Sequence, residues 1–122
     1  METTKLQTVD YEFEGRVYRL VCNMNVIADV QDAYNGNLMA ALRARHGLKS
    51  TLAFFAAMLT EAADTQNMMD ESGLPLRFTG KELGRRFSMR QTLDVGEKIW
   101  PLIEAAVRPA EPEDGAAEDE KN

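Results

Sequence analysis

The sequence predicts an α+β fold that is predominantly helical, with an N-terminal β-hairpin, about five short-to-medium helices and a disordered acidic C-terminal tail. Three observations support this prediction: strict alternation of apolar and polar residues near the start, several capped segments with helical spacing, and a final shift to Pro, Ala, Glu and Asp. We expect one compact domain over residues 1–107, made of the hairpin (8–22) and a helical part (25–107), followed by the tail (108–122).

The hairpin is predicted from a period-2 pattern, in which Val9, Tyr11 and Phe13 alternate with acidic residues. The dipeptide Glu14-Gly15 supplies a two-residue turn, because glycine tolerates positive φ. Closure at that turn sets the register: Phe13 faces Arg16, Tyr11 faces Tyr18, Asp10 faces Arg19 and Val9 faces Leu20. Tyr11 and Tyr18 then lie on one apolar face, which must be covered because an isolated hairpin is marginal in water.

The first two helices are predicted from their caps. Asn25 is expected to cap the first and Gly36 to stop it in a left-handed C′ position. Asn37 is expected to cap the second, which ends by Gly47.

The strongest helix is predicted to begin at Ser50 or Thr51 and to run to about residue 65. Its apolar stripe is widened by Phe54 and Met58, which suggests a central helix contacted on more than one side. A break follows at Gly73-Leu74-Pro75.

Two capping boxes predict the last helices: Thr79 with Glu82, and Ser88 with Gln91. The final helix is expected either to kink at Pro101 or to end near Lys98 and restart. Its predicted apolar positions are Met89, Leu93, Val95, Ile99, Leu102, Ile103 and Ala106.

Composition excludes several classes of function. One cysteine (Cys22) and one histidine (His46) argue against a zinc site; we expect Cys22 to be buried and His46 to lie at a helix end. No apolar run is long enough to span a membrane, and the acidic, polar start is unlike a signal peptide, so we expect a cytoplasmic protein. Of the net charge of −6, the last fifteen residues carry −4, and the near-neutral body gives no general attraction to nucleic acid.

No catalytic constellation, phosphate-binding loop or metal-binding motif is present, so we expect neither enzymatic activity nor a cofactor. Carboxylate pairs such as Asp29 with Asp32 are interpreted as solvated helix faces. One basic cluster consists of Lys81, Arg85, Arg86 and Arg90. It is a candidate binding site for an acidic partner or nucleic acid. A solvated face is the favoured interpretation, because Glu82 interrupts the cluster and no aromatic residues are interleaved.

The segments Phe13-Glu14-Gly15-Arg16-Val17-Tyr18-Arg19-Leu20 and Asn25-Val26-Ile27-Ala28-Asp29-Val30-Gln31-Asp32-Ala33-Tyr34-Asn35-Gly36 carry a resemblance. With the helix over 50–65 and the Thr79–Glu82 helix start, the chain resembles the tail assembly chaperones of long-tailed bacteriophages and related gene transfer agents over about residues 8–107. The resemblance implies an assembly factor, absent from the mature virion, that binds the tape measure protein and helps to recruit tail tube subunits. It carries no catalytic residues.

The partner-binding surface is predicted from apolar residues. We expect Tyr11 and Tyr18 to combine core and contact roles, with self-association through the hairpin edge as a further possibility. A helical partner segment is expected to bind near Phe54, Met58, Met68 and Met69, because methionine adapts to varied partners. The alternative is that Phe54 and Met58 simply belong to the core.

Two other function classes stay open. One is a structural head–tail or tail subunit that remains in the phage particle. The other is a small DNA-binding or antitoxin-type regulator that uses the Lys81–Arg90 cluster.

Overall fold

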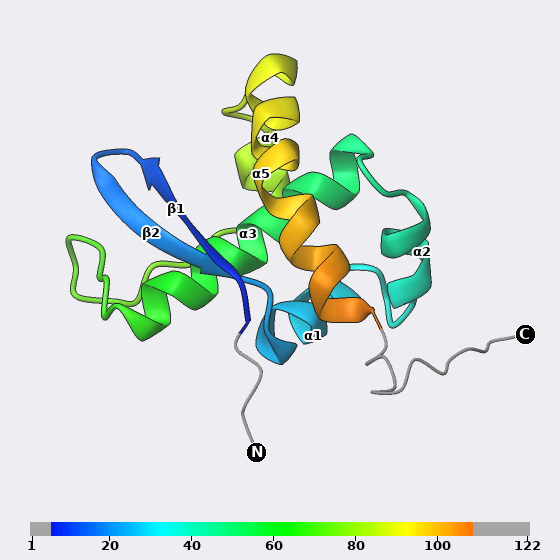
Figure 1. Ribbon diagram of the computed structural model, residues 1–122. Helices are drawn as coiled ribbons and strands as arrows, with labels where there is room; N and C mark the ends of the chain where they lie inside the picture. Colours follow the sequence, from blue (N-terminus) through cyan, green and yellow to red (C-terminus); the bar gives the residue numbers. More distant parts are fainter. Residues whose placement is uncertain (1–5, 109–122) are drawn as a thin grey trace, which may run out of the picture.

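The computed structural model describes residues 6–108, which form a two-stranded antiparallel sheet and five helices (Figure 1). Helices make up 56% of the described residues, so the predominantly helical α+β fold is confirmed. The predicted disordered tail lies outside the described residues except for Arg108. In chain order the elements are β1 (Thr8–Phe13), β2 (Arg16–Val21), α1 (Met24–Ala33), α2 (Leu38–Arg43), α3 (Leu48–Thr65), α4 (Gly80–Gly84) and α5 (Met89–Val107).

The hairpin has the predicted register, with Tyr11 opposite Tyr18 and Asp10 opposite Arg19. Both turn residues are left-handed, Glu14 with φ 54° and Gly15 with φ 80°. This is the backbone of a type I′ turn, whose twist matches that of the strands. The alternation of buried and exposed side chains therefore places one face of the sheet against the helices.

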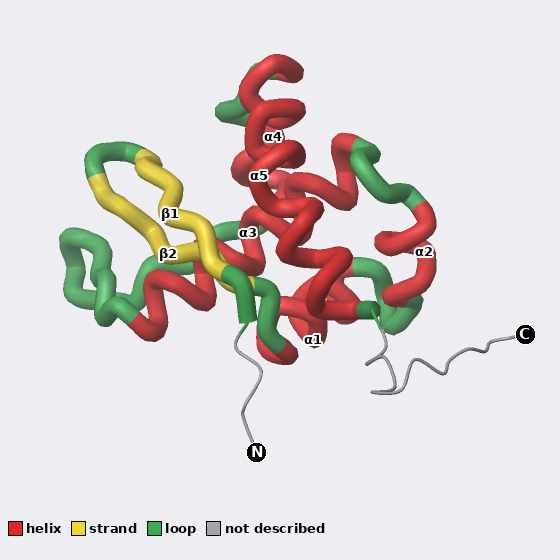
Figure 2. The backbone as a smooth tube through the Cα atoms, in the orientation of Figure 1, coloured by secondary structure: helices red, strands yellow, loops and turns green. Residues whose placement is uncertain are grey.

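Helix α3 is the centre of the fold, as its wide apolar stripe predicted. It contacts β2, α1, α4 and α5, and in Figure 1 α5 crosses it while the hairpin lies to one side. The loop between α3 and α4 lies beside β2 (Figure 2), and Arg16 donates a 3.3 Å hydrogen bond to the Met69 carbonyl in that loop.

Helix α1 begins earlier than predicted. The N-cap is Asn23, whose Oδ1 accepts a 3.1 Å hydrogen bond from the Val26 amide. Asn25 is wrong as the cap, because it already lies in the first turn, where its side chain donates to the carboxylate of Glu61. Asn23 donates to the same carboxylate at 2.8 Å, which ties the start of α1 to α3.

The end of α1 is a left-handed turn of two residues, Asn35 (φ 55°) and Gly36 (φ 89°). The Gly36 amide donates to the Gln31 carbonyl, so Asn35 holds the C′ position that was expected for Gly36. Asn37 caps α2 as predicted, and its Oδ1 accepts from the Ala40 amide at 3.2 Å.

Helix α3 begins at Leu48, and the prediction of a start at Ser50 or Thr51 is wrong. Gly47 occupies the N-cap without a side-chain hydrogen bond. The Ser50 hydroxyl instead donates to the Ala44 carbonyl at 2.6 Å and so joins the end of α2 to the first turn of α3.

The two capping boxes differ. At Ser88 both reciprocal hydrogen bonds with Gln91 are present, as predicted. At Thr79 only the hydroxyl accepts, from the Glu82 amide at 3.1 Å.

Helix α5 runs unbroken through Pro101, so of the two predicted alternatives at this proline the end near Lys98 is wrong. Pro101 is exposed, and its ring therefore does not have to fit into the core. The lost backbone hydrogen bond is one of many in a 19-residue helix.

The buried face of α5 also differs from the prediction. Met89 and Leu93 are 63% and 50% exposed, whereas Thr92, Gly96 and Trp100 are buried. The Trp100 indole donates a 2.9 Å hydrogen bond to the Thr51 hydroxyl, so its polar atom is satisfied inside the core.

Candidate functional site

The surface predicted at Phe54 and Met58 does not exist in the structure, because both side chains are 0% exposed. The Phe54 ring packs edge-to-face on Trp100 with centroids 5.5 Å apart. Both residues lie on the side of α3 that faces other elements. Their complete burial therefore favours the alternative, a core role for Phe54 and Met58.

The two hairpin tyrosines also pack inward. Tyr11 is partly buried, with its ring 5.1 Å from that of Phe55, and Tyr18 is 2% exposed, with its ring 5.9 Å from that of Phe78. Burial raises the pKa of both phenols, and the nearby Asp94 carboxylate raises the pKa of Tyr11 further. Tyr18 therefore offers almost no surface to a partner.

Of the two predicted methionines beyond α3, Met68 is partly buried against the core and Met69 is 43% exposed. Met69 forms an isolated antiparallel bridge with Pro75 that closes the loop between α3 and α4. The four residues predicted for a helical partner thus form no continuous exposed patch.

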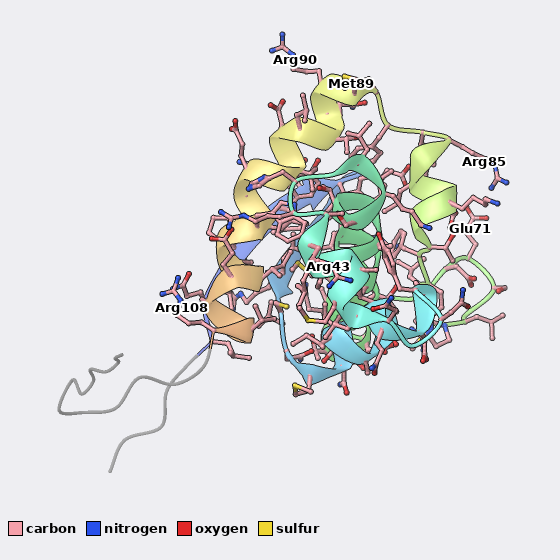
Figure 3. The ribbon with its side chains drawn as sticks, turned by 90° about the vertical axis from the view of Figure 1, so that its right-hand side faces the viewer. Arg43, Glu71, Arg85, Met89, Arg90 and Arg108 are labelled. Atoms are coloured by element: carbon pink, nitrogen blue, oxygen red, sulfur yellow. The ribbon has the colours of Figure 1, made fainter. Side chains whose placement is uncertain are left out.

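The predicted basic cluster is dispersed. Helix α4 ends at Gly84 and α5 begins at Met89, so Arg86 and Arg90 do not share a helix face. Figure 3 shows Arg85 and Arg90 at separate corners of the molecule, each pointing outward.

Arg86 is already engaged within the fold. Its guanidinium pairs with Glu14 at the hairpin turn and with Glu82 on α4, and it lies 5.3 Å from the centre of the Phe13 ring. Arg86 therefore fastens the hairpin tip to α4, and Lys81, Arg85 and Arg90 are the members of the predicted cluster that form no ion pair among the described residues.

The structure has a concavity elsewhere, in a groove between α1 and α4 with α3 as its floor. The groove has a volume of about 1070 Å³. A helix about 10 Å across would fill that volume over roughly 14 Å, or about nine residues. The α3 residues that line it are mostly small: Lys49, Leu52, Ala53, Ala56, Ala57, Thr60 and Asp64.

The groove was missed from the sequence, although a signal was present. Ala53, Ala56, Ala57 and Thr60 follow helical i, i+3, i+4, i+7 spacing. At about 100° per residue, the centre of this stripe lies on the side of α3 opposite to Phe55. Small side chains at that spacing allow another backbone to approach closely. The large apolar residues Phe54 and Met58 are instead buried in the core.

Close packing of α4 forms one wall of the groove. At Gly80, an added Cβ would lie 3.3 Å from the backbone nitrogen of Ala53, so glycine permits this approach. The preceding segment is held by Thr60, whose hydroxyl accepts from the Phe78 amide at 3.0 Å.

The walls carry charges of opposite sign. Asp29 and Asp32 lie on the α1 side and Lys81 on the α4 side. At one end Lys49 lies 4.9 Å from the centre of the Tyr34 ring.

Beside the groove lies an acidic rim, defined here by Asp29 and Asp32 on α1 and by Glu61 and Asp64 on α3. Desolvation raises the pKa of Asp29, and the carboxylates of the other three raise it further, while Arg77 acts in the opposite direction. Arg77 pairs with Asp64 at 2.6 Å. Negative charge on this rim is therefore only partly compensated and would attract a cationic group.

The chemistry of the remaining candidates is limited. Cys22 is 2% exposed, as predicted, and burial raises its thiol pKa to about 12. His46 lies beyond the end of α2 with φ 64°, and its ring is 5.4 Å from that of Trp100. Within residues 6–108 no group of three or more His, Cys, Asp or Glu side chains is arranged to hold a metal ion.

Comparisons with known proteins add no relative: no family model, no curated protein and no solved structure matches this chain. Among the described helices, none combines the length and apolar character needed to cross a membrane. The fold and the groove define a small hairpin-and-helix protein with a groove of about 1070 Å³ between α1 and α4.

Proposed function

We propose that the chain is a non-enzymatic tail assembly chaperone that works in the cytoplasm of a bacterial host. Its groove holds amphipathic helical segments of a tape measure protein and keeps them soluble while tail tube subunits are recruited. The observation that carries the proposal is the groove between α1 and α4, with its floor of small residues on α3. The sequence resemblance supplies the identity of the partner.

The shape of the groove supports a helical ligand. An amphipathic helix presents a stripe of apolar side chains about 100° wide, and an apolar floor between two walls matches that stripe. Of the floor residues, Ala56 and Ala57 are almost fully buried, so a ligand would contact mainly the partly buried Leu52, Ala53 and Thr60. The walls add electrostatic selection: basic residues of the ligand would face Asp29 and Asp32, and acidic residues would face Lys81.

The other function classes receive less support. A DNA-binding regulator would need a continuous basic surface, and Arg85 and Arg90 point outward from separate corners (Figure 3). A structural tail subunit would remain in the particle, so mass spectrometry of purified virions distinguishes it from a chaperone.

A matched pair of substitutions on α1 tests the groove. Ala33 is exposed and lines it, whereas Ala28 is also exposed on the same helix but does not. In co-expression with the tape measure protein, Ala33→Trp should obstruct the groove and reduce the soluble yield of the partner, while Ala28→Trp should leave that yield unchanged. Equal yields with both variants, each folded by circular dichroism, would sink the proposal.

A further inference from the structure

The two edges of the hairpin differ in how their backbone groups are satisfied. On the β2 edge, the Arg19 amide donates to Oε1 of Gln66 at 2.8 Å, and Nε2 of Gln66 donates to the Val17 carbonyl at 3.0 Å. The side-chain amide of Gln66 thus imitates one peptide group of a third strand. Pairing of another chain with β2 would require Gln66 to be displaced.

The register shows which backbone N–H and C=O groups of β1 point away from β2. Val17 lies opposite Glu12, and Arg19 lies opposite Asp10. Because Val17 and Arg19 direct their backbone groups away from the hairpin, these are the non-hydrogen-bonded pairs of the ladder, and Glu12 and Asp10 also direct theirs outward. Thr8, two residues earlier, belongs to the same set.

This outer edge of β1 is open within the described part of the chain. No described residue donates to or accepts from the backbone groups of Thr8, Asp10 or Glu12. All three side chains are exposed. An edge strand with a row of unpaired amides and carbonyls is a template for another strand.

The edge is also acidic. Glu12 has no ion-pair partner among the described residues, and Asp10 has only an exposed 3.4 Å contact with Arg19. The Asp94 carboxylate lies close enough to influence the Tyr11 hydroxyl on the same strand. A strand placed beside β1 would therefore meet negative charge along its length.

We propose that the outer edge of β1 is a docking site for an extended segment of another protein that carries basic side chains at alternate positions. The segment adds a third strand, with backbone hydrogen bonds to Asp10 and Glu12 and its basic side chains beside their carboxylates. Main-chain pairing supplies affinity, and the alternating charges select the ligand. This site is separate from the groove and does not depend on the proposed function.

A second copy of the chain fits the edge poorly. When the centre of symmetry lies at Asp10, Tyr11 or Glu12, antiparallel pairing of β1 with itself places Asp10 opposite Asp10, Asp10 opposite Glu12, or Glu12 opposite Glu12. Like charges directly opposite each other destabilise a sheet. The edge therefore favours a basic partner strand over self-association.

The test uses the full chain and a fluorescent eight-residue peptide of alternating lysine and valine, with binding followed by anisotropy. Lysines opposite Asp10 and Glu12 would direct their amides at β1, and the valine amides would face away. Methylation of the backbone nitrogens of the lysines should weaken binding by about tenfold or more, because it removes their amide hydrogen bonds to β1. Methylation of the valine nitrogens keeps the same charge and should leave binding within about threefold of the parent peptide.

Proline substitutions provide the matching test on the protein. Glu12→Pro removes an outward amide and should also weaken binding by about tenfold or more, while Val17→Pro places the same ring on the edge already closed by Gln66 and should not. Equal binding of the two methylated peptides would show charge attraction alone and overturn the proposal. A dimer in sedimentation equilibrium that Glu12→Pro abolishes would assign the edge to a second copy and would also overturn it.

Discussion

Helix α3 has two unlike sides, and the difference between them decides what each can do. One side carries Phe54, Phe55 and Met58, all fully buried under other elements. The other carries Ala53, Ala56 and neighbouring small residues, and α1 and α4 stand apart across it. Large side chains fill the space between helices, whereas small ones leave a groove when the flanking walls are held by other contacts.

The comparison shows that side-chain volume, more than hydrophobicity, separates core from binding surface in this helix. Both sides are apolar, and both are in contact with protein. The aromatic side is already filled by its own fold. The alanine side retains volume for a ligand, which makes it the side on which binding and stability can be altered separately.

The largest effect is expected when charge is placed on the aromatic side of α3. Phe54→Asp with Met58→Asp would bury two carboxylates without partners, at a cost of several kcal/mol, which is comparable with the whole stability of a small domain. We expect loss of the folded signal in circular dichroism. Lys49→Asp, at an exposed groove position on the same helix, should remain folded. A folded double variant would mean that this side of α3 is not core.

A second substitution on the filled side removes Trp100. Trp100→Ala should destabilise the fold by about 3–5 kcal/mol through the cavity it leaves, measured by urea denaturation. Thr51→Val separates the hydrogen bond from the packing, since it leaves the buried indole N–H unpaired and should cost about 1–3 kcal/mol. A loss below about 1 kcal/mol for Trp100→Ala would contradict the burial described above.

Alkaline pH should destabilise the buried core through Cys22. The unfolded chain releases the thiol proton near its ordinary pKa of 9.0, whereas the folded chain retains it to about 12. The stabilisation is therefore fully present below pH 9.0 and falls as the pH rises through this window, by up to about 1.4 kcal/mol per pH unit. Urea denaturation at pH 8 to 10 should show this slope, and Cys22→Ala should reduce it; an unchanged slope would contradict the assignment. The raised pKa values of Tyr11, Tyr18 and Tyr34 act in the same direction at higher pH.

The smallest expected effect sharpens the description of the groove side. Gly84→Ala should stabilise the chain by about 0.5–1 kcal/mol, because an added Cβ would make only an ordinary 3.6 Å contact with Leu52. Gly80→Ala should not give this gain, because its Cβ would be pressed against the backbone of α3 at 3.3 Å. Thermal denaturation of the two variants compares them directly. Equal stabilisation by both would show that α4 does not need close approach at Gly80.

Local patterns in the sequence were sufficient for the hairpin and for the existence of the helices. Alternation and a two-residue turn determine the pairing of Tyr11 with Tyr18, because each choice involves residues close together in the chain. The caps at Asn37 and Ser88 are equally local. The start of α1 was misplaced by two residues because Asn23 and Asn25 are both competent caps. Both side chains donate to Glu61 on α3, but only Asn23 also accepts from a helix amide, that of Val26.

The candidate site was less accessible from the sequence. Whether Phe54 faces solvent or Trp100 depends on where α5 packs, and that information is spread over residues about fifty positions apart. The groove depends on a distance between α1 and α4, which no single helix encodes. The prediction of a shared basic surface was wrong for a similar reason. The break between α4 and α5 directs Arg86 toward Glu14 and away from Arg90.

The Gln66 amide that closes the β2 edge has a consequence for the order of events during synthesis. The chain is made from its N-terminus, and the hairpin is complete long before Gln66, which follows Arg19 by 47 residues. At about 5–20 residues per second, the edge of β2 stays without its cover for roughly 2–9 s. During that interval both edges of the nascent hairpin are open to other strands, so the newborn chain is more prone to mispairing than the finished protein.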